Sequence, residues 1–191
     1  MIRAARVLVP ALVLAAEGYL FVEYTRFGAL IHFWVHGLLG AALGFGVLTV
    51  WYLRAGAAGP GGGTPAAVWV AGLAGHLYAA APDVLFVAAD LVHQWWMDVF
   101  ALHVSIHFIP APPAVLLAVF SLALAGWAAA VLGRRRTAAT TLAATLVLVV
   151  AALALRDAPP TTLRELRQTP QLALRCSLES ARLASAGQAR P

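Results

Sequence analysis

The sequence contains no lysine and a single cysteine, Cys176. One cysteine excludes an intrachain disulfide and a cysteine-based zinc site, so a metal site in this chain would have to use histidines and carboxylates. Charged residues make up only 11% of the chain, whereas soluble domains average about 25%. This scarcity of charge excludes an ordinary soluble globular domain.

Hydrophobic residues are abundant instead, at 62% of the sequence, with a mean hydropathy of +0.83. They form runs near the length of about 20 residues that a helix needs to cross a bilayer. We predict an all-α, polytopic membrane helix bundle over residues 1–155, with a polar, partly amphipathic or disordered tail over 156–191. The five expected spans cover residues 7–24, 27–53, 66–91, 113–132 and 137–155.

Residues 93–108 are apolar but short for another span. We expect this segment to be re-entrant or interfacial, because a sixth span would move the cluster Arg134–Arg136 to the outer side.

All 13 basic residues are arginines, and seven of them flank the apolar runs. With a cytoplasmic N-terminus, six of these seven lie on the cytoplasmic side and only Arg26 lies outside, as the positive-inside rule favours. We therefore predict a multi-pass protein of the inner (plasma) membrane with an extracytoplasmic tail. Membrane lipids are the expected partners and nucleic acid is not, while a homo-oligomer or a partner in a membrane complex stays open.

The six histidines all lie in or beside apolar segments. Ionisable groups in hydrocarbon cost several kcal/mol unless they meet a partner or a wet cavity, so they are candidate functional groups. The predicted spans place most of them in one polar layer of the outer leaflet, together with Glu23 and Asp83. His32/His36 and His103/His107 are pairs four residues apart, a spacing that puts both rings on one helix face.

Further candidates follow from the stretch around Pro82, which is expected to break its helix and to line a cavity. His76 precedes this break and could reach the same cavity as Asp83. If residues 83–107 formed one helix, several polar side chains would share one face, with Asp98 farther round. The residues on that face would be Asp83, Asp90, His93, His103 and His107.

Neutral imidazoles and carboxylates suit a divalent metal, with zinc favoured and iron or manganese possible. The candidate ligands are His32, His36, His76, Asp83, His93, His103 and His107. Asp83 and Asp90 are the candidate catalytic bases. Three alternatives stay open: hydrogen bonding between helices without a ligand, axial haem ligation in a redox subunit, and an ion or proton relay in an accessory subunit.

Two packing features are also predicted. Gly40 and Gly44 form a Gly-x-x-x-Gly pattern, which permits close contact between helices. The aromatic residues at the ends of the runs are typical of interfacial belts; they are Tyr24, Trp51, Tyr52, Trp95 and Trp96.

Residues 76–107 resemble the membrane-bound metal-dependent hydrolase family of small bacterial inner-membrane proteins. That family has an early membrane histidine, a Pro-Asp-x-Asp element and a later histidine pair. Here these elements match His32 or His36, then Pro82-Asp83, then His103 and His107. Leu85 stands where the family has its second aspartate, and the last pair is spaced by four residues rather than five. The resemblance implies a metal-dependent hydrolase, and the predicted outer-leaflet site suggests a lipid or another membrane-associated ester or phosphodiester as substrate.

Overall fold

The computed structural model describes residues 2–26, 30–55, 65–89 and 95–158. In this part of the chain all regular structure is helical, which confirms the predicted all-α class. Asp90, His93 and the tail beyond residue 158 lie outside the described residues, so the predictions made for them stay predictions.

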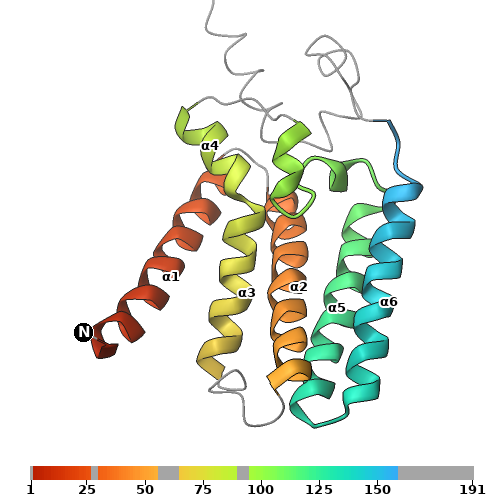
Figure 1. Cartoon of the computed structure of the whole chain (residues 1–191). Helices are drawn as coiled ribbons and strands as arrows, with labels where there is room; N and C mark the ends of the chain where they lie inside the picture. Colours follow the sequence, from red (N-terminus) through yellow and green to blue (C-terminus); the bar gives the residue numbers. More distant parts are fainter. Residues whose placement is uncertain (1, 27–29, 56–64, 90–94, 159–191) are drawn as a thin grey trace, which may run out of the picture.

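Within these described ranges, six α-helices form a bundle with α2 at its centre, flanked by α3 on one side and by α5 and α6 on the other (Figure 1). They are α1 (Ile2–Arg26), α2 (Leu30–Ala55), α3 (Pro65–Ala79), α4 (Ala81–Ala89), α5 (Pro112–Val131) and α6 (Arg135–Ala154). Within the described residues, four helical stretches are long and apolar enough to cross a membrane: Val7–Arg26, Leu30–Ala55, Pro112–Val131 and Arg135–Ala154. The sequence and the fold together therefore define a helical membrane protein.

The predicted third span, residues 66–91, is divided into α3 and α4. Pro82 lies in the first turn of α4, where its missing N–H is tolerated. The α3 helix has 15 residues, which is shorter than the roughly 20 of a typical spanning helix. A fifth span therefore stays a prediction, although α3 runs alongside α2 (Figure 1).

Residues 95–111 form no spanning helix and lie at the end of the bundle where α1 ends and α2 begins (Figure 1). They contain two short 3₁₀ helices, η1 (Trp95–Val99) and η2 (Ser105–His107), separated by turns. Ala101 and Leu102 have φ angles of 54° and 59°, in the left-handed region that interrupts an α-helix. A single helix over residues 83–107, the condition for placing the polar side chains on one face, therefore does not form. The re-entrant or interfacial character of residues 93–108 stays a prediction.

Close packing between α2 and α3 depends on glycine, as the Gly-x-x-x-Gly pattern predicted. A Cβ atom on Gly40 would lie 2.3 Å from the carbonyl oxygen of Gly75, and one on Gly44 would lie 2.1 Å from that of Ala71. Neither position has room for a side chain. The two backbones therefore touch, which fixes the position of α3 and of the break that follows it.

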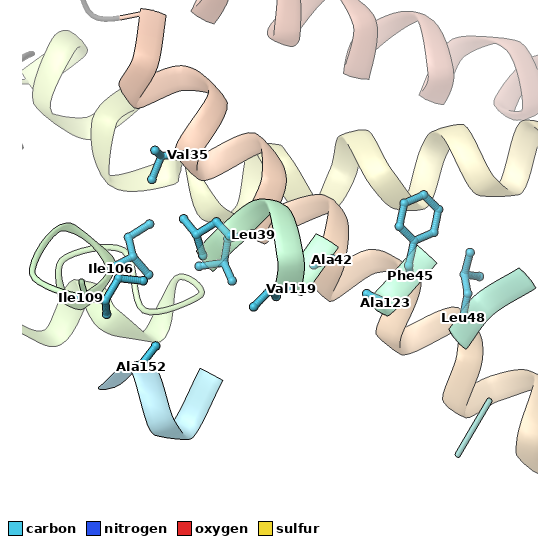
Figure 2. Close-up of a cluster of buried hydrophobic side chains, with 11 residues drawn as sticks. Val35, Leu39, Ala42, Phe45, Leu48, Ile106, Ile109, Val119, Ala123 and Ala152 are labelled. Atoms are coloured by element: carbon cyan, nitrogen blue, oxygen red, sulfur yellow. The ribbon is translucent and has the colours of Figure 1, made fainter. Parts of the chain in front are cut away.

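The main hydrophobic core runs along α2 and includes side chains of α5, α6 and the segment 95–111 (Figure 2). Val35, Leu39, Ile106 and Ile109 form one end of this core, and Phe45 lies towards the other end. Burial of Ile106 and Ile109 anchors the segment 95–111 on the bundle by the hydrophobic effect.

Candidate metal centre

Four buried imidazoles meet at the end of the bundle. His32 and His36 come from α2, and His103 and His107 come from the segment 95–111. One nitrogen of each ring can be chosen so that all four atoms lie within 4.8 Å of one another. Two nitrogens bound to the same zinc ion are at most about 4 Å apart, since each Zn–N distance is about 2.0–2.1 Å. The group therefore has nearly the dimensions of one coordination shell and could hold one metal ion.

The rings are in direct contact with each other. His36 and His103 stack with centroids 4.0 Å apart and planes at 5°, and His32 and His107 stack with centroids 4.5 Å apart and planes at 11°. Each stack joins α2 to the segment 95–111. The rings of His32 and His36 lie on the same side of α2, as their i,i+4 spacing predicted. His103 and His107, however, lie on turns and η2 rather than on an α-helix.

Asp83 is fully buried against three of these rings. Its Oδ1 lies 3.2 Å from Nε2 of His32 and 3.4 Å from Nε2 of His103, and its Oδ2 lies 3.7 Å from Nε2 of His36. Asp83 occupies the first turn of α4, and the positive end of a helix dipole favours a carboxylate there. The break at Pro82 therefore delivers a carboxylate to the imidazoles.

The same break determines how His103 is protonated. Nδ1 of His103 lies 2.7 Å from the carbonyl oxygen of Ala79, and because a carbonyl can only accept, Nδ1 is the donor. The amide of Asp83 donates to the carbonyl of Ala80 instead, which leaves the carbonyl of Ala79 for the imidazole. In a neutral His103 the lone pair is then on Nε2, the nitrogen that faces Asp83.

This geometry brings electron-rich atoms together. Nε2 of His36 lies 3.0 Å from Nε2 of His32, and Nε2 of neutral His103 faces a carboxylate oxygen at 3.4 Å. Such lone pairs repel unless a proton or a metal cation lies among them. A single divalent ion would satisfy all of these nitrogens at once, and imidazole is a good ligand for zinc, iron and copper.

Tyr24 belongs to the site, although the sequence predicted it for an interfacial belt. Its side chain is 1% exposed and its hydroxyl donates to Oδ2 of Asp83. The partners are 59 residues apart in the chain, and no local pattern links them. The one available signal was that an aromatic residue with a polar group at the end of a helix can also turn inward.

Asp98 holds the segment that carries His103 and His107. Its Oδ1 accepts from the backbone N–H groups of Val104 and Ser105, each at 2.9 Å, and its Oδ2 accepts from the Ser105 hydroxyl at 2.6 Å. Arg156, just after α6, also donates to that hydroxyl. Asp98 therefore replaces backbone hydrogen bonds that this irregular segment cannot make, and it positions the two histidines.

Two predicted members of the polar layer lie elsewhere. Nδ1 of His76 is 2.8 Å from Oε2 of Glu17, and both side chains are buried between α1 and α3. Glu23 pairs with the exposed Arg26 at 2.8 Å. Among the five histidines that the structure describes, four are thus brought together, and His76 is not part of the group.

No family model, curated protein or solved structure matches this chain.

Proposed function

We propose that the protein is a metal-dependent membrane hydrolase whose centre is formed by His32, His36, His103 and His107. The observation that carries this proposal is the convergence of four buried imidazoles on a buried carboxylate. The expectation from the resemblance points the same way, since it used His32 or His36, then Asp83, then His103 and His107.

Zinc is the ion we favour, because a set of neutral imidazoles with a carboxylate is typical of it. When bound, such an ion supplies Lewis-acid activation of water and of a carbonyl or phosphoryl oxygen. The contact between stacked rings, with His36 and His103 centroids 4.0 Å apart, leaves no space for a porphyrin between them. A bare ion therefore suits the site better than haem.

Asp83 is the residue we assign as general base. A base must lie within hydrogen-bond reach of the proton it takes, and Asp83 lies beside three of the four imidazoles. Tyr24 donates to its other oxygen and so holds the carboxylate in place while Oδ1 faces the rings. The proposed substrate is a lipid or another membrane-associated ester or phosphodiester.

A second candidate function is favoured by the depth of burial. All four imidazoles and Asp83 are buried, whereas a catalytic zinc keeps a position open for water or substrate. The burial of the site agrees with a metal ion whose coordination positions are all occupied by protein groups. Such an ion would clamp α2 to the segment 95–111 in a non-catalytic accessory subunit.

Two measurements test both functions. Metal content is determined by mass spectrometry on detergent-purified protein, comparing the wild type with His103→Ala/His107→Ala and with His76→Ala. We expect one zinc per chain in the wild type and in His76→Ala, where a buried imidazole outside the group is lost, and none in the double variant. Absence of bound metal from correctly folded wild type that has been incubated with zinc would overturn both functions.

Hydrolysis is then assayed with p-nitrophenyl dodecanoate and bis(p-nitrophenyl) phosphate. The hydrolase predicts turnover that a chelator abolishes, that added zinc restores, and that Asp83→Asn reduces by at least 100-fold. One zinc per chain without turnover of either substrate would reject the hydrolase and support the clamp.

A further inference from the structure

His76, which is paired with Glu17, lines a pocket that the four-histidine centre does not use. The pocket lies mainly between α2 and α3 and has a volume of about 350 Å³, within the range of about 300–1,000 Å³ typical of small-molecule sites. Its lining is apolar and aromatic apart from His76, and includes Phe33, Trp34 and Phe45.

The pocket is elongated along the helices. It extends on α2 from Phe33 to Phe45, a distance of about 18 Å at ~1.5 Å per residue. Phe33 and His76 touch at one end, with ring centroids 4.5 Å apart, so the polar group lies at that end. Trp34 and Trp69 also line the pocket and are 59% and 70% exposed. Trp34 lies on α2, which is long and apolar enough to cross a membrane, and an exposed side chain on such a helix faces lipid, so the pocket is bordered by a lipid-facing residue.

The imidazole of His76 offers a hydrogen-bond donor at this end. Nδ1 shares a proton with Oε2 of Glu17 at 2.8 Å. A buried pair of this kind is stable when it is neutral overall, because a net charge in apolar surroundings is costly. Both neutral arrangements, an ion pair or a carboxylic acid beside a neutral imidazole, place a proton on Nε2. Nε2 is buried and has no hydrogen-bond partner among the described residues.

Gly37 packs over the face of this ring. A Cβ atom on Gly37 would lie 3.6 Å from Cε1 and Nε2 of His76 and 3.7 Å from its Nδ1, and Gly37 itself lines the pocket. A glycine at this position thus leaves room beside the imidazole at the polar end of the pocket.

We infer that this pocket is a second site, separate from the metal centre, which binds the fatty acyl chain of a membrane lipid ester. The chain lies along α2 and α3, and its ester carbonyl accepts a hydrogen bond from Nε2 of His76. The length and apolar lining of the pocket fit an extended chain parallel to the helices, and the single donor at one end fits a single carbonyl. The inference requires neither bound metal nor hydrolysis.

The test uses methyl dodecanoate labelled with ¹³C at its carbonyl as the probe, bound to full-length protein in detergent. Affinity is measured by native mass spectrometry, and the labelled carbonyl band is recorded by infrared spectroscopy. Dodecane, which has the same chain without a carbonyl, is the competitor. We expect the wild type to prefer the ester over dodecane by about five- to tenfold, as one hydrogen bond provides, with the carbonyl band moved to lower wavenumber.

Gly37→Ala is the first variant, because its methyl group would lie over the face of the His76 ring at an ordinary contact distance and fill space at the polar end of the pocket. We expect it to bind the ester more weakly than the wild type does. Gly46→Ala is the matched control on the same helix, since its Cβ would meet only Leu142, at 3.9 Å, and it should behave like the wild type. Equal affinity for the ester in the wild type and in Gly37→Ala would overturn the inference.

Glu17→Leu/His76→Leu is the second variant, which removes both members of the pair so that no buried charge is left alone. It should bind the ester and dodecane equally well while retaining its metal. The binding of decylubiquinone, whose ring carries carbonyl groups, is measured in the same way. Binding of this quinone to the wild type more tightly than the ester would show a quinone site and overturn the assignment to an acyl chain.

Discussion

Nδ1 of His103 donates to the carbonyl oxygen of Ala79, 2.7 Å away, across the break between α3 and α4. This hydrogen bond fixes the tautomer of the imidazole and leaves Nε2 to face the other histidines and Asp83. Bonds of this type commonly orient histidine ligands in metal sites and increase their basicity.

His103→Asn separates this hydrogen bond from metal binding. The amide nitrogen of asparagine takes the place of Nδ1 and can still donate to Ala79, whereas no atom replaces Nε2. We expect zinc affinity to fall by at least 100-fold, measured by competition with a chelator. The metal-free variant should unfold within about 1 kcal/mol of the metal-free wild type, since the net value of one hydrogen bond is retained. Unchanged zinc affinity would show that His103 is no ligand.

Tyr24→Phe removes the hydroxyl that donates to Asp83. Loss of a hydrogen bond to a buried charged group costs about 1.5–3 kcal/mol, so the thermal unfolding temperature should fall. Tyr19→Phe on the same helix is the control, because Tyr19 is 52% exposed, and it should unfold like the wild type. The contact with Asp83 would contribute nothing if both variants unfolded at the same temperature.

Asp98→Ala removes the acceptor for two backbone N–H groups and for the Ser105 hydroxyl. We expect zinc affinity to fall by about 10–100-fold, the usual effect of losing a group that orients metal ligands, while the wild-type metal stoichiometry is still reached at high zinc. Ser121→Ala, which removes an exposed hydroxyl bonded to its own helix, should leave the affinity unchanged. Wild-type affinity in Asp98→Ala would mean that the segment 95–111 holds its shape without this residue.

Gly40→Ala tests the contact between α2 and α3. The added Cβ would lie 2.3 Å from the carbonyl oxygen of Gly75, and overpacking of this kind costs about 1–3 kcal/mol. Gly18→Ala is the matched control, because its Cβ would meet nothing within 4 Å and alanine favours a helix by about 1 kcal/mol. We expect a lower unfolding temperature for the first variant and an equal or higher one for the second. The reverse order would contradict the packing described here.

The membrane helices were predictable because each depends only on a local apolar run. The expected spans 27–53 and 113–132 agree with Leu30–Ala55 and Pro112–Val131 to within three residues at each end. The shared face that a single helix over 83–107 would have created does not exist, because left-handed residues and the Asp98 hydrogen bonds interrupt such a helix, and neither has a periodic signature.

The candidate site was predictable where its ligands are close in sequence. Pairs spaced by four residues identified His32/His36 and His103/His107, and Pro82-Asp83 identified the carboxylate. Tyr24 and the separation of His76 from the group depend on which helix faces which, and hydropathy does not determine that. His76 lies opposite Glu17 because α3 packs beside α1 as well as α2.

The origin of the four imidazoles also determines when the centre can form. His32 and His36 lie on the second helix, whereas His103 and His107 follow the fourth. Because a chain is synthesised from its N-terminus, the first pair enters the bilayer before the second pair exists. The four-histidine group can therefore form only late in membrane insertion. A metal ion could bind all four histidines only after the chain as far as His107 has been inserted and has reached the end of the bundle where α2 begins.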